Sequence, residues 1–160
     1  MKKIDLFFML LVISLTLLAG CNQQPSSLSN NDASAMPSKS EPELLAGSQA
    51  KYYTFTKEAY DQALKDDKII LLYFYANWCP ICKAEQPKTF AAFNELTNPS
   101  IVGFRVNYKD GETDDFEEEL AKKYGVTYQH TKVIIKDGER VLKAPDSWDK
   151  ERYLEELGKF

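Results

Sequence analysis

The feature that most restricts the fold of this chain is an uninterrupted apolar run at residues 69–76, IILLYFYA. Successive side chains of a strand point to opposite faces of its sheet, so a strand that is apolar throughout must be covered on both faces. Such a strand lies at the centre of a sheet, with helices packed on each side. The run therefore favours an α/β architecture over an all-helical or all-strand one.

The segments around this run alternate between strand and helix patterns. Strand patterns occupy residues 52–56, 69–76 and 101–108 and a hairpin at 131–144, and helical patterns occupy 56–68, 79–96, 114–125 and 149–160. Asp137-Gly138 marks the turn of the hairpin, and Gly125 marks the end of the third helix. This order predicts a mixed α/β sheet with helices on both faces, in one domain that spans residues 51–160.

Aromatic and aliphatic side chains at helical spacing are assigned to the core of this domain. Trp148 is expected to cover the end of the sheet and to anchor the last helix. The acidic run at 114–119 is interpreted as the solvated start of a helix. The predicted core positions of the last two helices are Phe116, Leu120, Tyr153, Leu154 and Leu157.

Two of the three cysteines, Cys79 and Cys82, stand two residues apart in the stretch YANWCPICKAEQP. Cys79 follows the buried strand and falls in the first turn of a helix, where backbone N–H groups lack partners and stabilise a thiolate. Pro80 suits this turn because proline has no N–H group. Cys82 lies one turn further and is expected to be more buried. Disulfide exchange needs this arrangement, in which an exposed sulfur attacks and a sheltered sulfur resolves.

Other uses of the cysteine pair are metal binding, a static disulfide and plain burial. The chain has a single histidine, so it lacks the residues for Cys2His2-type zinc sites and for Ser/His or Cys/His hydrolase sites. One combination, Cys79 and Cys82 with His130, would suit Cu(I) or zinc. The net charge is −4 and no basic stripe is present, which argues against nucleic acid as a partner.

The stretch FYANWCPICK resembles the active site of thioredoxin-like proteins, and the resemblance extends over residues 52–160. Trp78 directly precedes the first cysteine, and Pro87 matches the proline in the active-site helix of that family. The resemblance implies a thioredoxin-like fold with Cys79 as the nucleophile and Cys82 as the resolving thiol. It implies no cofactor beyond the redox-active Cys79–Cys82 disulfide. The substrate-docking or modulating residues would be Trp78, Pro80, Ile81, Gln129, His130 and Thr131.

Three departures from the family pattern lie at the site. Pro80-Ile81 replaces the Gly-Pro of reducing thioredoxins, which leaves the direction of electron flow open. Tyr73 stands where many members bury an aspartate that assists proton transfer. His130 occupies the position of the family's cis-proline. A non-proline cis bond costs about 2.5–4 kcal/mol, so we expect a trans bond between Gln129 and His130 and a reshaped loop.

Three interpretations of His130 follow from its position. The imidazole fills the space of the proline, or it lies near Cys79 and either stabilises the thiolate or passes protons in place of the missing carboxylate. In the third interpretation it is the metal ligand of the Cys79, Cys82 and His130 site.

The N-terminal residues have the layout of a secretory signal, with Lys2 and Lys3 ahead of an apolar run at residues 6–18. The run is shorter than the roughly 20 residues that span a bilayer, which favours cleavage. Leu18-Ala19-Gly20-Cys21 resembles the bacterial lipobox, which implies a signal peptide at 1–20 and a Cys21 lipidated with fatty acids such as palmitate. Residues 21–50 are rich in Ser, Asn, Gln and Pro and are expected to form a flexible tether.

Together these features predict a membrane-tethered, extracytoplasmic thiol:disulfide oxidoreductase that is lipid-anchored to the bacterial cell membrane and acts as a monomer. It is expected to reduce disulfides of exported cysteine-containing proteins and to receive electrons from a transmembrane thiol carrier. The alternative function is that of a copper-binding chaperone that uses Cys79, Cys82 and His130.

Overall fold

The computed structural model of the protein describes residues 41–160. The predicted signal peptide, the lipidated Cys21 and residues 21–40 of the predicted tether lie outside the described residues. No helix within 41–160 has the length and apolar character needed to cross a membrane.

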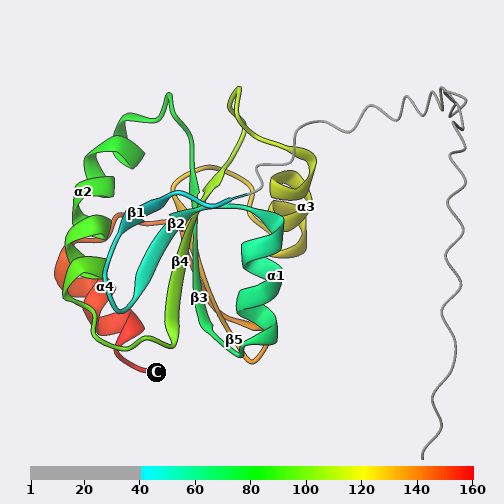
Figure 1. Ribbon diagram of the computed structural model, residues 1–160. Helices are drawn as coiled ribbons and strands as arrows, with labels where there is room; N and C mark the ends of the chain where they lie inside the picture. The colour runs from blue at the N-terminus through cyan, green and yellow to red at the C-terminus, as the bar shows by residue number, and fades with distance from the viewer. Residues whose placement is uncertain (1–40) are drawn as a thin grey trace, which may run out of the picture. The chain divides into compact units, whose positions relative to one another are not determined.

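A mixed sheet of six strands runs through the described part of the chain (Figure 1). The three parallel strands β2, β4 and β3 lie side by side, while β1, β5 and β6 each run antiparallel to a neighbour. All of β3 is buried, which confirms that the apolar run is a central strand. In spatial order the strands are β1 (Leu44–Ala46), β2 (Lys51–Thr54), β4 (Ile101–Asn107), β3 (Ile69–Tyr75), β5 (Thr131–Lys136) and β6 (Glu139–Ala144).

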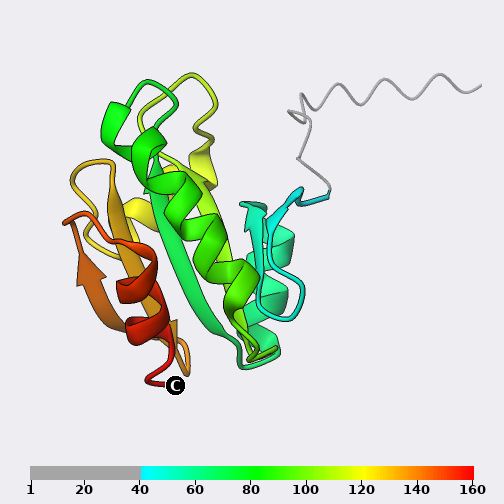
Figure 2. The same cartoon turned by 90° about the vertical axis from the view of Figure 1, so that its left-hand side faces the viewer.

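Helices cover both faces of this sheet, which lies between two layers of helices in Figure 1, and Figure 2 looks onto one of these layers. Helices α1 and α3 share one hydrophobic cluster with the sheet, and α2 and α4 share the other. The predicted α/β fold, a mixed sheet with helices on both faces, is confirmed. The helices of the described residues are α1 (Lys57–Lys65), α2 (Pro80–Glu95), α3 (Asp115–Lys123) and α4 (Lys150–Leu157).

Local sequence determines where the elements begin and end. Thr56 caps α1 by accepting a hydrogen bond from the backbone N–H of Ala59. Asp114 and Glu117 form a reciprocal capping box at the start of α3. The turn between β5 and β6 has positive φ at both Asp137 and Gly138, as expected of an Asp-Gly hairpin turn.

Two sequence-based expectations are corrected by the fold. Residues 44–46 were assigned to the tether, yet they form β1, because backbone pairing with β2 holds a strand too short to show a pattern. The sheet therefore includes residues from the predicted tether, and Ala46 and Ala50 are buried in its core. Phe116 is 47% exposed rather than core, and the ammonium of Lys57 lies over its ring.

Candidate active site

The two described cysteines lie where β3 leads into α2. Cys79 is the N-cap of α2 and has an extended backbone, and its Sγ accepts a hydrogen bond from the Cys82 N–H at 3.2 Å. Pro80 is the first helical residue and Pro87 lies inside the same helix, as the sequence predicts. The two cysteines are therefore placed together at the positive end of a helix, with Cys79 before its first residue and Cys82 in its first turn.

Both thiols are less accessible than a nucleophile was expected to be. Cys79 is 3% exposed and Cys82 is fully buried, so the expectation of an exposed attacking sulfur is wrong, although Cys82 is the more buried of the two. Cys79 is covered because its sulfur turns back toward the first turn of α2 and packs with Tyr75 and Ala76. A partner's disulfide would reach this sulfur only after a small local opening.

Two exposed apolar side chains are next to the cysteines in sequence. Trp78 directly before Cys79 and Ile81 directly before Cys82 are 53% and 56% exposed, and Tyr128, in the loop before β5, is 49% exposed. The Trp78 indole is held in place because its N–H donates to the backbone carbonyl of Lys109 at 3.0 Å. Trp78 is therefore a fixed and exposed aromatic ring directly before Cys79.

The Cys82 thiol lies against the hydroxyl of Tyr73. Burial and the hydrogen bond with Cys79 raise the pKa of Cys82 to about 11, so this thiol is protonated at neutral pH. A hydrogen bond links the same thiol to Tyr73, whose own pKa is raised by burial and by the nearby Glu85 carboxylate. Tyr73 is therefore a neutral hydroxyl next to Cys82.

His130 joins this hydroxyl to the rest of the site. Its Nδ1 lies 3.0 Å from the Tyr73 hydroxyl, and its Nε2 lies 3.0 Å from Ser147 Oγ and 3.1 Å from Glu85 Oε2. The residue is 7% exposed and has a φ of 69°, and its backbone N–H donates to Phe74 O at 2.7 Å. A left-handed backbone at a side chain that makes this many contacts is typical of a functional or tightly constrained position.

The neighbours of His130 in the chain have separate roles. Thr131 is buried and donates from its hydroxyl to the carbonyl of Tyr128 at 3.0 Å, whereas Gln129 is partly exposed. A trans bond between Gln129 and His130 stays a prediction. The positive φ of His130 is in line with the reshaped loop that was expected there.

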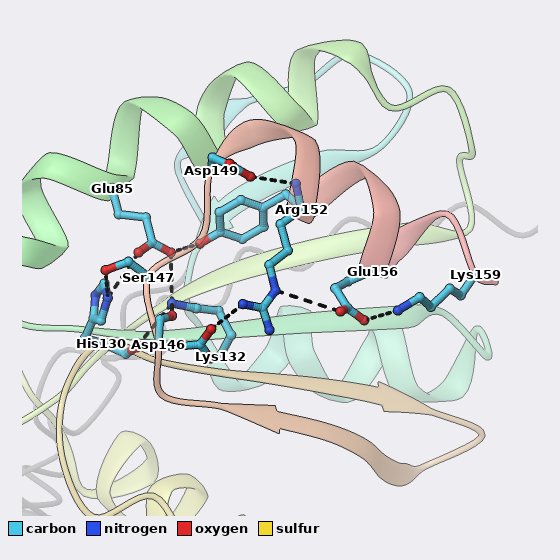
Figure 3. A network of polar contacts seen from close by, with 10 residues as sticks. Glu85, His130, Lys132, Asp146, Ser147, Asp149, Arg152, Glu156 and Lys159 are labelled. Carbon is cyan, nitrogen blue, oxygen red and sulfur yellow. Dashed lines mark hydrogen bonds and ion pairs between the residues drawn. The ribbon is translucent and has the colours of Figure 1, made fainter.

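A buried ion pair lies directly behind His130 (Figure 3). Glu85 Oε1 is 2.9 Å from the ammonium of Lys132 and accepts a hydrogen bond from the Tyr153 hydroxyl at 2.6 Å. Lys132 is fully buried and also donates to the backbone carbonyls of His130 and Asp146. Each charge of the pair thus has partners that offset the cost of its burial.

Sequence reasoning missed this network, although it left two signals. Lys132 interrupts the apolar pattern of β5, and Glu85 lies on the buried face of α2 with Cys82 and Thr89. A charged residue at a core position calls for a partner of opposite charge. Local patterns could not show that these two positions meet.

The groups around His130 shift its pKa in opposite directions. Burial and the neighbouring Lys132 lower the pKa of His130, while Glu85 and Asp146 act to raise it. Burial also lowers the pKa of Lys132, against the stabilising carboxylate of Glu85. Because the pKa of His130 lies below its usual value, the imidazole is mainly neutral at neutral pH.

The contacts of the neutral ring indicate where its proton resides. Nε2 faces Ser147 Oγ and the Glu85 carboxylate, so the proton is favoured on Nε2, because a nitrogen lone pair there would repel the carboxylate. The hydrogen bond goes to Ser147, which leaves Glu85 Oε2 with the ion-pair contact alone among the described residues. Nδ1 is then free to accept the hydrogen bond of the Tyr73 hydroxyl.

The alternative metal site is not assembled in residues 41–160. No group of three or more His, Cys, Asp or Glu side chains is arranged there to hold a metal ion. Both ring nitrogens of His130 contact oxygen atoms, on Tyr73, Ser147 and Glu85. No observation in this part of the chain favours the copper chaperone.

Known proteins are similar in sequence to the domain that holds these cysteines. The family model described as Thioredoxin matches residues 51–159. The probable protein disulfide-isomerase A4 of Caenorhabditis elegans is 35% identical over 88 residues, which are 54% of this chain and 13% of that protein. The thioredoxin of Echinococcus granulosus is 31% identical over 81 residues, which are 51% of this chain and 68% of that protein. The matched region thus spans only a small part of the first relative and about two thirds of the second.

A solved structure shows the same fold. The crystal structure of thioredoxin from Aeropyrum pernix matches with a TM-score of 0.56 at 24% identity, over 74% of this chain and 92% of that one. The sheet order and the helices on both faces are therefore those of a thioredoxin-like α/β fold.

Proposed function

This chain belongs to the thioredoxin family, and from that premise we propose that it is a thiol:disulfide oxidoreductase that acts through the Cys79/Cys82 dithiol. The observation that most supports the proposal is the placement of the cysteine pair at the N-terminus of α2, with Cys79 as the N-cap and Cys82 in the first turn. The family match and the similarity to a thioredoxin and to a protein disulfide-isomerase support this chemistry.

The reaction proceeds in two exchanges. The Cys79 thiolate attacks one sulfur of a client disulfide, and the other client sulfur leaves as a thiolate. Cys82 then attacks Cys79 in the mixed disulfide, which releases the second client thiolate and leaves a Cys79–Cys82 disulfide. The dithiol itself supplies the two electrons, so the step requires no bound cofactor.

The protein works as a reductase in this proposal. A strong oxidant of this kind owes its potential to a stabilised reduced form. Cys82 adds no such stabilisation, because burial raises its pKa to about 11 and keeps it a neutral thiol in the reduced protein. This environment supports electron flow from the dithiol to the client.

Clients bind over the exposed surface beside the cysteines. Trp78 and Ile81 are the exposed apolar residues next to Cys79, and an unfolded or flexible cysteine-containing segment would cover them. Pro80 shapes the first turn of α2, and the loop with Gln129 and Thr131 lies at the start of β5. We assign docking and modulating roles to these residues.

The cellular setting in this proposal comes from residues 1–50. The secretory layout and the Leu18-Ala19-Gly20-Cys21 motif support a lipid anchor on Cys21 and an extracytoplasmic domain. The clients are then exported cysteine-containing proteins, and a transmembrane thiol carrier resupplies the electrons. Incorporation of labelled palmitate that is lost in Cys21→Ser, with release of the protein from the membrane fraction, tests the anchor.

Two cysteine substitutions test the proposed chemistry. Cys79→Ser is expected to abolish disulfide reduction, because it removes the attacking sulfur. Cys82→Ser is expected to accumulate mixed disulfides with clients, because the second exchange cannot occur. Non-reducing gels and a turbidity assay of insulin reduction measure both effects. Normal reductase activity in Cys79→Ser would contradict the assignment.

A further inference from the structure

We infer that Tyr73, His130 and Glu85 form a proton relay that takes the proton from Cys82 when this cysteine resolves the mixed disulfide. The inference rests on the proposed function and adds to it the route of the proton and the residues that accept it. Tyr73 is the group in contact with the reacting thiol, while His130 and Glu85 act through it.

The resolving step needs a base because Cys82 holds its proton tightly. With a pKa raised to about 11, only about one Cys82 in ten thousand is a thiolate at neutral pH in the dithiol form, and burial, the largest cause of the shift, also acts in the mixed disulfide. The titratable groups near this thiol are Cys79 at the start of its own helix, Tyr52, Tyr73, Tyr75 and the buried Lys132 on the sheet, and Glu85 one turn along α2. Of these, Tyr73 is the one whose hydroxyl hydrogen-bonds to the Cys82 sulfur and also to a basic nitrogen.

Tyr73 does not act as a base by ionising, since burial raises its pKa far above neutral. A hydroxyl has both a donor and an acceptor site, so it can accept one proton while it donates another. The Tyr73 oxygen faces the Cys82 thiol and, at 3.0 Å, the Nδ1 of His130. The Tyr73 hydroxyl is thus placed to link the thiol and the imidazole in a transfer of two protons.

His130 is suited to receive the proton in both protonation state and position. It is neutral because burial and Lys132 lower its pKa, and its Nδ1 is the free acceptor. Once protonated, its Nε2–H faces Ser147 and the Glu85 carboxylate at 3.0 and 3.1 Å. Glu85 therefore stabilises the imidazolium in the way that a carboxylate orients and stabilises the histidine of a catalytic triad.

The other charges around His130 limit how strongly the proton is held. Lys132 shares the Glu85 carboxylate with His130, and its positive charge opposes protonation of the imidazole. Asp146 favours protonation of the imidazole. Tyr153 donates to Glu85 from α4 and fixes the carboxylate in place. This balance keeps the affinity of His130 for a proton low enough that the proton can leave again.

The proposed step is balanced in atoms and electrons. The Cys82 proton moves to the Tyr73 oxygen as the Tyr73 proton moves to Nδ1 of His130. The Cys82 thiolate attacks Cys79 Sγ, and the Cys79–Cys82 bond forms as the bond from Cys79 to the client sulfur breaks. The electron pair of that bond leaves with the client thiolate, so the client is reduced and the dithiol is oxidised. His130, which is 7% exposed, then releases the proton to solvent.

Stopped-flow kinetics with a small chromogenic disulfide separates the two exchanges. Reduced protein is mixed with dithiobis(nitrobenzoate), which releases one coloured thiolate when Cys79 attacks and a second when Cys82 closes the ring. Tyr73→Phe and His130→Asn remove the relay. Tyr52→Phe is the matched control, because Tyr52 is a buried tyrosine whose hydroxyl has no hydrogen-bond partner in the described residues.

The expected result is a decrease in the rate of the second phase alone. Tyr73→Phe and His130→Asn each slow it by about a hundredfold or more at neutral pH, the usual size of a general-base effect, and leave the first phase unchanged. In both variants the rate of the second phase rises about tenfold for each pH unit above neutral, while the wild type levels off. Tyr52→Phe behaves like the wild type in both phases.

Two results would overturn the relay and leave the proposed function intact. A second phase in Tyr73→Phe with the rate and pH profile of the wild type would show that the hydroxyl moves no proton. Equal slowing of both phases in Tyr73→Phe and His130→Asn, with an unaltered pH profile, would assign these residues a purely structural role. If no coloured thiolate appeared even with the wild type, the proposed function itself would fail, and the relay with it.

Discussion

His130 links three elements of the fold through its side chain. It contacts β3 at Tyr73, α2 at Glu85, and the segment before α4 at Ser147. A proline at this position would make none of these contacts. The substitution therefore brings a titratable group into contact with the hydroxyl that stands in place of the family's buried carboxylate.

Titration of His130 is a direct check on this environment. We expect its imidazole to titrate below the usual value of about 6.5, because burial and Lys132 lower its pKa. As it is the single histidine of the chain, its ring protons give one unambiguous NMR signal. A midpoint above about 6.5 would contradict the described surroundings of the ring.

The same shift predicts how stability depends on pH. As the pH falls, His130 takes up a proton in the unfolded chain at a higher pH than in the folded protein, so protonation stabilises the unfolded state below about pH 6.5. The free energy of unfolding should therefore decrease between about pH 6.5 and the pKa of His130 in the folded protein. Below that pKa, His130 should cause no further decrease. Urea titrations over this range measure it, and His130→Asn should lack this contribution.

The Glu85–Lys132 pair is expected to show strong coupling. Glu85→Gln leaves the buried Lys132 ammonium without its carboxylate and should cost about 3–5 kcal/mol of unfolding free energy. Lys132→Met alone leaves the carboxylate without its ammonium. The double variant should lose less than the sum of the two single losses. Denaturant unfolding of all four proteins tests this, and strictly additive losses would contradict a direct buried pair.

Among the elements, β4 approaches α2 so closely that only glycine fits at position 103. A Cβ there would lie 2.5 Å from ring atoms of both Phe93 and Tyr52. Gly103→Ala should therefore destabilise the protein by about 1–3 kcal/mol, the usual cost of overpacking a core. The control is Gly111→Ala, because a Cβ at Gly111 meets nothing within 4 Å and should change stability by less than about 0.5 kcal/mol. Thermal unfolding compares the two, and equal effects would contradict this contact.

Periodicity and turn residues were sufficient to predict most of the elements. The apolar run became the central strand, and Gly125 and Asp137-Gly138 ended the elements that they were expected to end. β1 could not be predicted, because three residues held by backbone pairing leave no pattern of side chains. Phe116 was placed wrongly because helical spacing gives a face but not how far that face is covered.

The candidate site was predictable only in part. The spacing of Cys79 and Cys82 after a buried strand identified the helix N-terminus that now holds them. The network behind them depends on contacts that α2 makes with β5 and α4, such as those of Glu85 with Lys132, 47 residues further along the chain, and with Tyr153, 68 residues further along. Local patterns carry no information on such pairs, so only the folded arrangement shows them.

Over the whole molecule, the two layers of helices have different roles. The layer of α1 and α3 is a hydrophobic core, while the layer of α2 and α4 also encloses the charged network next to the cysteines (Figure 3). The dithiol lies at one end of the sheet with exposed Trp78 and Ile81 beside it. The fold thus combines a sheltered proton path with a surface on which a client can bind.

The reduction potential of the Cys79/Cys82 pair tests the central claim most directly. Purified protein is equilibrated in thiol/disulfide buffers of known potential, and alkylation followed by mass spectrometry counts the free thiols. We predict that both thiols disappear together, as a Cys79–Cys82 disulfide forms, with a midpoint near the roughly −270 mV of reducing thioredoxins. A midpoint near the roughly −120 mV of strong oxidants would contradict the reductase. Thiols that never pair at any buffer potential would contradict the dithiol mechanism as a whole.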